Sequence, residues 1–391
     1  MFKVQTYNKI SVSGLERFDR SNYEVASELS HPDAILLRSH KLASVDVAGS
    51  VLAIARAGAG VNNIPVSEMT ARGIVVFNTP GANANAVKEL VLAGMLLGSR
   101  DILGGVRFVR QQQQANTDVA LSVLLEAEKK QFAGNELAGK TLGVVGLGAI
   151  GSLVANVALD LGMTVLGYDP ALTVESALRL SNRVQRVENL QALVQRADFV
   201  SLHLPVLDST RHLINADLLK MARPHLCLLN FAREEIVDNA AVAGALKTGQ
   251  IRLYVTDFPT LELTALPGVI PMPHIGASTA EAEDNCAVMA ADQLKDFLQY
   301  GNIRHSVNFP TVSMECSGGY RLAITNRNVP KMLGKVLSVL ADSNNNIIDM
   351  INKSREDVAY NLIDVAEKPS EAVLNNIAAI EGIINVRLIE V

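Results

Sequence analysis

The amino-acid sequence predicts an α/β protein with two doubly wound parallel-sheet domains and a smaller C-terminal unit with an antiparallel sheet. Three observations predict this fold class. Short apolar runs alternate with helical patterns up to about residue 300, as they do in repeated βαβ units. A glycine-rich turn follows one of these runs directly. After residue 319 the order changes to βαββαβ, which is typical of a ferredoxin-like unit.

Composition narrows the class of protein. The net charge of −5 is spread along 391 residues without a basic block, so we expect no nucleic acid as a partner. No segment resembles a membrane span or a signal peptide, so we expect no membrane partner. The cysteines, Cys227, Cys286 and Cys316, lack metal-ligand spacing. We therefore expect no metal and a reducing, cytoplasmic compartment.

Three apolar runs in the N-terminal region, residues 34–37, 51–55 and 75–77, are predicted parallel strands. Arg38 and Arg56 follow the first two. Ligands of open parallel sheets bind at the carboxyl ends of strands, so both arginines are candidate contacts for an anionic substrate. Solvated surface charge is the alternative. The neighbouring residues of this candidate substrate site are Ser39 and Gly58.

A long apolar helix is predicted over residues 83–99, where apolar residues recur at helical spacing. The polar stretch that follows, with Gln111 to Gln114, is interpreted as a solvated helix or arm.

The run at 141–145 is a predicted strand that breaks into a GxGxxG turn with Gly146, Gly148 and Gly151. These glycines allow a tight turn, close approach of backbone N–H groups to a pyrophosphate, and close packing of the next helix. The N-terminus of that helix favours phosphates. Asp169 ends the second strand, where a carboxylate binds ribose hydroxyls and favours NAD over NADP. The alternative is a glycine turn in a buried helix–strand pair.

Strand patterns continue at 198–205, 226–230, 253–257 and 269–270, and a long helix at 279–300 leads back toward the N-terminal part. The first domain is therefore expected to be discontinuous, and residues 302–319 form a predicted linker. The predicted domains are a substrate-binding domain at 1–97 and 281–313, an NAD-binding domain at 98–280, and a C-terminal domain at 319–391.

Three strand ends each deliver one polar side chain suited to oxidising a secondary alcohol. His274 would accept the hydroxyl proton as a hydride leaves carbon, and Glu262 would hold its ring. Arg233 would bind a neighbouring carboxylate and polarise the oxygen of the reacting carbon. Each residue alone has a structural explanation, and only the joint arrangement favours catalysis.

The chain resembles the D-2-hydroxyacid dehydrogenase family, in its branch with a C-terminal ACT domain. The motifs that carry the resemblance are RAGAGVNNI from Arg56, NTP from Asn78, ELAGKTLGVVGLGAIG from Glu136, NFAREEIVDN from Asn230, TDFPTLE from Thr256 and PHIGAST from Pro273. They span nearly the whole chain. The resemblance implies one domain of the flavodoxin-like kind and one of the Rossmann kind. The chain differs from the family where Glu234 and Glu235 replace small residues, and where the usual Glu-Pro pair is missing.

By that resemblance Arg233, Glu262 and His274 fall on the catalytic positions. NAD is the expected cofactor, and the expected cofactor-binding residues are Thr79, Val87, Gly146, Gly148, Ala149, Ile150, Gly151, Asp169, His203, Leu204, Pro205, Phe231, Ala232, Arg233, Asp257, His274 and Gly276.

The expected substrate is 3-phosphoglycerate, bound in an interdomain cleft. Its carboxylate and phosphate need several cations, which Arg38, Arg56 and Arg233 would supply beside His274. The expected product is 3-phosphooxypyruvate, at the start of serine synthesis. The alternatives are an unphosphorylated acid, such as D-lactate or 2-hydroxyglutarate, and an NAD-sensing protein without enzymatic activity.

The C-terminal unit resembles an ACT domain, a module that binds amino acids at dimer interfaces. Asn326, Asn328 and Asn346 fall where serine-binding members place polar side chains, so L-serine is a candidate regulator. Lys331 stands where many members have glycine. The alternative is a plain oligomerisation module. We expect a homodimer or homotetramer, and Lys129 or Lys130 matches a position that reaches a neighbouring subunit in some relatives.

Overall fold

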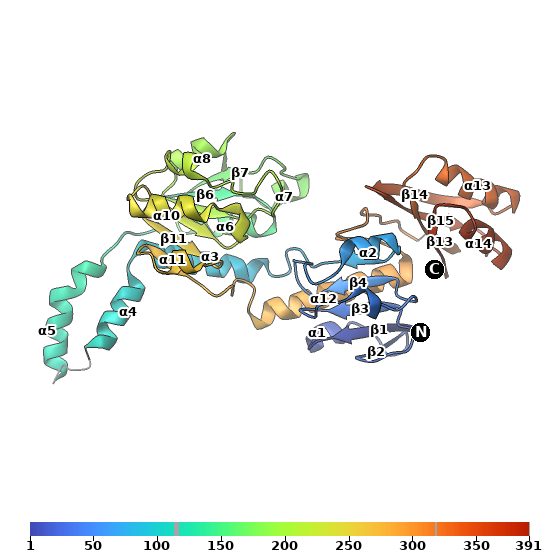
Figure 1. Ribbon diagram of the computed structural model, residues 1–391, viewed down its shortest axis with the longest axis horizontal. Helices are drawn as coiled ribbons and strands as arrows, with labels where there is room; N and C mark the ends of the chain where they lie inside the picture. The colour runs from blue at the N-terminus through green and yellow to red at the C-terminus, as the bar shows by residue number, and fades with distance from the viewer. Residues whose placement is uncertain (113–116, 317–318, 391) are drawn as a thin grey trace. The chain divides into compact units, whose positions relative to one another are not determined.

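The computed structural model describes residues 1–112, 117–316 and 319–390. Residues 113 and 114 of the predicted polar stretch and residues 317 and 318 of the predicted linker therefore lie outside the described residues. The chain forms two compact units (Figure 1). Unit 1 comprises Met1–Asn83 and Ala280–Val391, and unit 2 comprises Ala84–Thr279.

Unit 1 contains a five-stranded parallel sheet in the order β2-β1-β3-β4-β5, which confirms the first predicted doubly wound sheet. The order reverses beside β1, as in flavodoxin-like sheets. The strands are β1 (Phe2–Tyr7), β2 (Tyr23–Ala26), β3 (Ala34–Leu37), β4 (Ala53–Arg56) and β5 (Val75–Phe77), with helices α1 (Val12–Leu15) and α2 (Val66–Ala71).

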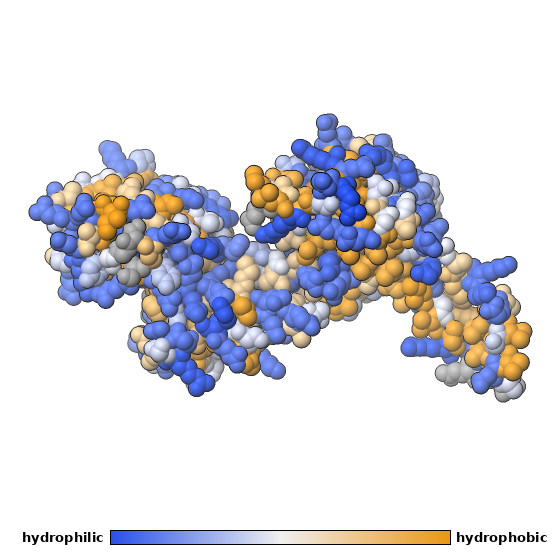
Figure 2. Space-filling view, turned by 180° about the vertical axis from the view of Figure 1, so that it is seen from behind, coloured by the Kyte–Doolittle hydropathy of each residue, from blue (hydrophilic) through white to orange (hydrophobic). Residues whose placement is uncertain are grey.

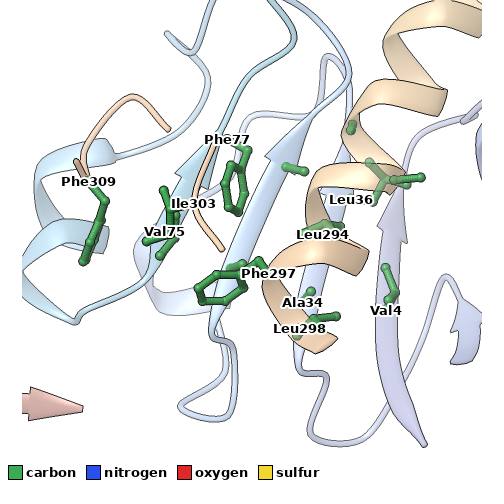
Figure 3. Close-up of a cluster of buried hydrophobic side chains, with 14 of the residues drawn as sticks. Val4, Ala34, Leu36, Val75, Phe77, Leu294, Phe297, Leu298, Ile303 and Phe309 are labelled. Carbon is green, nitrogen blue, oxygen red and sulfur yellow. The ribbon is translucent and has the colours of Figure 1, made fainter. Parts of the chain in front are cut away.

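The long helix α12 (Ala280–Tyr300) packs against this sheet and covers much of its core. Leu294, Phe297 and Leu298 lie opposite side chains of the strands (Figure 3). The rings of Phe77 and Phe297 meet edge to face with centroids 5.8 Å apart. The return of the chain after residue 280 thus completes the core around the N-terminal sheet, so unit 1 is built from two separate stretches of sequence. That this unit binds the substrate stays a prediction.

Unit 2 contains a seven-stranded parallel sheet in the order β12-β11-β10-β9-β6-β7-β8, which is the Rossmann order with one added strand. The strands are β6 (Thr141–Val145), β7 (Thr164–Tyr168), β8 (Gln185–Arg186), β9 (Phe199–Leu202), β10 (Cys227–Asn230), β11 (Leu253–Thr256) and β12 (Val269–Pro271). The helices of this sheet are α3 (Ala84–Ser99), α6 (Ala149–Asp160), α7 (Val174–Arg179), α8 (Leu190–Arg196), α9 (Ala216–Leu219), α10 (Asn239–Lys247) and α11 (Leu261–Thr264).

Helix α3 belongs to unit 2, whereas the sequence-based boundary at 97/98 assigns it to the first domain. The reason lies in its small residues. Gly94 lies against Leu229 and Phe231, and Gly98 lies against Cys227, so the helix packs closely on β10. An apolar helix pattern alone does not tell which of two sheets the helix will cover.

Two helices, α4 (Ile102–Gln111) and α5 (Asp118–Glu128), project from unit 2 as an arm (Figure 1). A short 3-10 helix at Lys129–Phe132 leads back to the sheet, and Phe132 packs against Phe108 with ring centroids 5.4 Å apart. Hydrophobic side chains are exposed over this arm (Figure 2).

The C-terminal part has the predicted βαββαβ order and an antiparallel sheet, β14-β15-β13-β16, which confirms the ferredoxin-like topology. Its elements are β13 (Tyr320–Arg327), α13 (Met332–Asp342), β14 (Ile347–Arg355), β15 (Val358–Val365), α14 (Glu371–Ala378) and β16 (Ile383–Glu390). Lys331, at the N-cap of α13, has a φ of 73°, the left-handed conformation in which glycine is less strained.

Side chains of this antiparallel sheet bond to the carboxyl end of α12. Arg387 donates to the carbonyl of Phe297 at 2.6 Å, and the Tyr360 hydroxyl donates to that of Gly301 at 2.7 Å. Arg321 donates to the carbonyl of Tyr300 at 3.0 Å. Guanidinium groups at a helix C-terminus donate hydrogen bonds to its last carbonyls, and their positive charge interacts favourably with the helix dipole. The ferredoxin-like part is thereby fixed to the rest of unit 1.

None of the helices among the described residues is long and apolar enough to cross a membrane. All three cysteines are free, with Cys227 and Cys286 buried and Cys316 exposed.

Candidate active site

The predicted dinucleotide turn lies between β6 and α6, at the point where the strand order of unit 2 reverses. Gly146 has a φ of 91°, and a Cβ there would lie 2.5 Å from the carbonyl oxygen of His203. A Cβ on Gly151 would collide with the carbonyl oxygen of Gly146. Both positions therefore require glycine, one for the turn and one for close packing of the helix.

The N-terminus of α6 is open to a ligand. Gly148 is its N-cap, and no side chain among the described residues caps the helix. A Cβ built on Gly148 would have no atom within 4 Å, so space lies in front of the N–H groups. Uncapped N–H groups and the helix dipole suit a pyrophosphate. Residues Ala149 and Ile150 form the first turn.

Asp169, just beyond β7, is held beside this turn. Its carboxylate accepts the backbone N–H of Leu147 at 2.8 Å and that of Ala171 at 2.9 Å. The acid and the glycine turn are thus joined directly, as a site for the adenosine ribose and pyrophosphate requires. The residues of this part of the structure fit NAD.

His203 follows β9 and borders the same turn. Burial lowers the pKa of His203 to about 3, so its imidazole is neutral at physiological pH. Its Nε2 lies 2.9 Å from the hydroxyl of Ser201, while its buried Nδ1 has no partner among the described residues. A neutral ring with one unused nitrogen is available to a bound cofactor.

Arg233 lies in the turn that follows β10. The turn is held by Asn230, which is fully buried. The Asn230 side chain accepts the N–H of Ala232 at 3.1 Å and donates to the carbonyl of Arg233 at 2.9 Å. The Arg233 side chain itself is exposed. A guanidinium on a rigid turn is suited to binding a carboxylate.

His274 lies in the loop after β12 and has a φ of 56°, an uncommon backbone conformation for a residue with a side chain. Buried Asp257, just beyond β11, accepts the N–H groups of Ile275 at 2.9 Å and Gly276 at 2.7 Å. The ring of Phe258 lies 4.7 Å from the imidazole, centroid to centroid. These contacts hold the loop that presents the imidazole, and strained backbone of this kind is common at functional sites.

Glu262 has Lys247 as its ion-pair partner in this structure. Its carboxylate, in α11, is largely exposed and lies 4.0 Å from the ammonium of Lys247. The ion pairs among the described residues include none between Glu262 and His274, so their pairing stays a prediction. The contact that orients the His274 ring in this structure is with Phe258.

The unit 1 candidates lie together at the ends of β3, β4 and β5. Arg56 donates to the carbonyl of Arg38 at 3.0 Å, and a Cβ on Gly58 would lie 2.7 Å from an Arg56 Nη atom, so glycine makes room for this guanidinium. The N–H of buried Thr79 donates to the carbonyl of Gly58 at 3.1 Å. Arg38 forms an ion pair of 2.7 Å with Glu283 of α12.

The other sequence candidates have varied surroundings. Val87 lies near Gly276, where a Cβ on the glycine would be 3.6 Å from a Val87 methyl. Leu204 packs near Gly146, and Phe231 packs in the core against Gly94. Ser39 and Pro205 are exposed, and Ala232 is buried in the Arg233 turn. The sequence analysis did not select Asn230 or Phe258 as functional residues. The only feature of the sequence that marks them is their position at or just after the end of a predicted strand.

The regulatory candidates in the ferredoxin-like part differ in exposure. Asn326 is buried, and its side chain accepts from Asn361 at 2.8 Å and donates to the carbonyl of Arg327 at 2.7 Å. Asn328 donates to the carbonyl of Glu356 at 2.9 Å and is exposed. Asn346 is exposed.

Comparison with known families gives one domain match. Residues 93–276 match the model of the D-isomer specific 2-hydroxyacid dehydrogenase, NAD binding domain. The match includes the glycine turn, Asp169, Arg233 and His274.

Among curated relatives, the D-3-phosphoglycerate dehydrogenase of Methanocaldococcus jannaschii is 34% identical over 337 residues, or 84% of this chain and 61% of that protein. The D-3-phosphoglycerate dehydrogenase of Haemophilus influenzae is 33% identical over 90% of this chain and 85% of its own length. A solved structure of the NAD+-bound 3-phosphoglycerate dehydrogenase of Entamoeba histolytica has a TM-score of 0.60 and 26% identity, covering 78% of this chain and 98% of that one.

Proposed function

The chain belongs to the D-isomer specific 2-hydroxyacid dehydrogenase family, and from that premise we propose that it oxidises 3-phospho-D-glycerate to 3-phosphooxypyruvate with NAD. The observation that carries the reaction type is the pair of rigid loops in unit 2 that present Arg233 and His274, beside a turn that fits NAD. The phosphorylated substrate is proposed by analogy with the relatives, which are named for it.

When held by the glycine turn and Asp169, NAD+ would supply the acceptor for the hydride of carbon 2. A ring nitrogen of His274 accepts the proton of the hydroxyl on that carbon as the carbonyl forms. Arg233 binds the substrate carboxylate and orients the hydroxyl toward the imidazole. The proposed role of Glu262 is to orient the His274 ring, which requires its exposed side chain to turn toward the imidazole on substrate binding.

A panel of hydroxy acids at saturating NAD decides among the candidate substrates, with NADH formation followed by absorbance. We expect 3-phosphoglycerate to give a higher kcat/KM than D-lactate or D-2-hydroxyglutarate. One observation favours an unphosphorylated acid instead, since Glu283 neutralises Arg38 in this structure. Turnover of D-lactate or 2-hydroxyglutarate alone would establish that alternative, and NAD binding without turnover of any acid would indicate a sensing protein.

Arg56 is proposed to bind the anionic end of the substrate, with Arg38 beside it. We expect Arg56→Ala to raise KM for 3-phosphoglycerate roughly 10- to 100-fold, because a hydrogen bond to a charged group contributes about 1.5–3 kcal/mol. KM for NAD should change less than about twofold, because Arg56 lies outside the NAD-binding unit. Initial rates with each substrate varied in turn measure both constants.

The matched control for Arg56 is Arg17→Ala. Arg17 also belongs to unit 1, but it lies on the surface, where it pairs with Asp292 of α12 at 2.7 Å. Both KM values should stay at their normal level in this variant. Equal increases of the two constants in Arg56→Ala would contradict the substrate-binding assignment.

We propose that the chain forms a homodimer or a homotetramer, assembled through the α4–α5 arm. Val106 and Val109 in α4 are nearly half exposed, and Val119 and Val123 in α5 are more exposed still. A groove of about 600 Å³ runs along α4 between Val106, Val109 and Phe132. Apolar helix faces of this kind are normally covered by another chain.

Val106→Glu should therefore lower the molecular mass in solution to that of a smaller assembly, because burying a carboxylate in an apolar interface is costly. Light scattering coupled to gel filtration measures the mass. The control is Val45→Glu, at an exposed valine of unit 1, which should leave the mass unchanged. A wild-type mass of one chain would exclude the dimer.

We also propose that L-serine binds the ferredoxin-like part and inhibits the enzyme, with Asn346 and Asn328 as contacts and Asn326 as their buried support. Initial rates should then fall with increasing L-serine but not with D-serine, and Asn346→Ala should weaken the inhibition. An unchanged rate at high L-serine would favour a plain oligomerisation module.

We propose a cytoplasmic location, with which the three free thiols are compatible.

A further inference from the structure

A buried polar network lies beneath the two loops of unit 2 that present Arg233 and His274. It starts at Asn230, the last residue of β10, and continues to Tyr254 and Thr256 of β11. The exposed fraction of each of these three residues is 1% or less. Buried polar groups are costly unless they are paired, so a network at this position needs a structural or functional reason.

The network has hydrogen bonds under each of the two loops, and neighbouring positions on β10 and β11 connect them. Asn230 Nδ2 donates to the carbonyl of Arg233 at 2.9 Å and lies 3.3 Å from the hydroxyl of Tyr254. Tyr254 and Thr256 lie two residues apart on β11, so their side chains point to the same face of the sheet. The Thr256 hydroxyl accepts the N–H of Phe258 at 3.0 Å.

The far end of the network reaches the imidazole. Phe258, whose backbone N–H bonds to Thr256, packs its ring against the His274 ring. Asn230 and Thr256 also lie opposite each other in the parallel register of β10 and β11. The two functional side chains therefore share one buried support, although they are far apart in the sequence.

We infer that Asn230 and Tyr254 are positioning residues, which set the placement of the Arg233 turn relative to the loop of His274. This inference rests on the proposed function, because it assumes that both loops act on one substrate. Both side chains are buried, so their proposed action on the substrate is through the loops that they support. Misplacing a catalytic group by about 1 Å costs on the order of 10²-fold in rate, so a small shift of the turn is measurable.

The test uses Asn230→Asp, which keeps the acceptor for Ala232 but removes both N–H donors, and Tyr254→Phe, which removes only the hydroxyl. We expect Asn230→Asp to lower kcat/KM for the hydroxy acid by about 10²-fold and Tyr254→Phe to lower it less. The dissociation constant for NADH, measured by fluorescence, should stay within about twofold. The full-length protein is used in each case.

A double-mutant cycle separates positioning from general destabilisation. If Asn230 acts through Arg233, then Asn230→Asp should cause little further loss in an Arg233→Ala background. If Asn230→Asp lowered kcat/KM as much in the Arg233→Ala variant as in the wild type, the inference would be overturned. The control is Asn308→Asp in unit 1, because Asn308 is also buried and bonds to Val76 N–H and the Ile74 carbonyl. It should lower stability without changing kcat/KM.

A second readout does not depend on activity. Arg233 Nη1 donates to the carbonyl of Ala232 at 2.6 Å, an arrangement that the Asn230 turn maintains. An arginine-specific dicarbonyl reagent, followed by peptide mass spectrometry, should label Arg233 several-fold faster in Asn230→Asp and in Tyr254→Phe, with labelling of Arg17 unchanged. Unchanged labelling of Arg233 would overturn the inference. If labelling of Arg233 changed in the variants but the wild-type protein oxidised no acid, the proposed function would be refuted and the structural role of Asn230 and Tyr254 would stand.

Discussion

Replacing His274 with asparagine is expected to lower kcat for hydroxy-acid oxidation by about 10²–10⁴-fold, because the reaction loses the base that accepts the hydroxyl proton. Asparagine tolerates the left-handed backbone of this position, where φ is 56°, so the loop should keep its shape. The hydrogen bonds from Ile275 and Gly276 to Asp257 use backbone N–H groups and remain available. NADH binding should therefore be preserved, and stopped-flow rates with saturating NAD and acid measure the loss.

The chain contains a matched control for this substitution. His305 also has a φ of 56° and is exposed, but it belongs to unit 1. His305→Asn should leave kcat unchanged. Any effect on folding of an asparagine in the left-handed backbone conformation should appear in both variants. A His274→Asn enzyme with wild-type kcat would show that another group accepts the proton.

Replacing Arg321 with methionine is expected to lower the free energy of unfolding by about 3–5 kcal/mol, because it leaves a buried carboxylate without its partner. Both side chains of the Arg321–Asp364 pair have an exposed fraction of 1% or less. Arg321 donates to the two Asp364 oxygens at 2.6 and 2.8 Å and to the carbonyl of Glu315 at 3.0 Å. Urea unfolding followed by circular dichroism measures the change.

Two further variants show whether the loss comes from the uncompensated charge. Arg321→Met combined with Asp364→Leu should recover much of the stability, because replacing both buried ions by apolar groups is often nearly neutral. Lys368→Met breaks an exposed ion pair with Glu390 and should not shift the urea midpoint measurably. A loss in the double variant as large as that in Arg321→Met would point to the carbonyl contacts instead.

Local patterns in the sequence predict much of the fold. The strands at 141–145 and 164–168 and their glycine turn lie where the sequence places them, because backbone conformation there depends on residues close in the chain. The ferredoxin-like order is predictable for the same reason.

Contacts between distant segments are not predictable in this way. The ion pair of Arg38 with Glu283 joins the end of β3 to the start of α12, and no local pattern signals it. Glu262 lies shortly after Asp257, and its carboxylate pairs with Lys247 at 4.0 Å, a contact that the local sequence does not signal because an exposed side chain can adopt several rotamers. The support from Asn230 depends on parallel register, which only the folded sheet defines.

The bonds from Arg387, Arg321 and Tyr360 to the last carbonyls of α12 have a consequence for truncation of the chain. A protein that stopped after residue 316 would leave those carbonyls and the apolar surface around Phe297 and Phe309 facing water. Such a fragment would be prone to aggregation. The C-terminal part thus covers apolar surface of unit 1, and we expect a chain that lacks it to be less stable than the full-length protein.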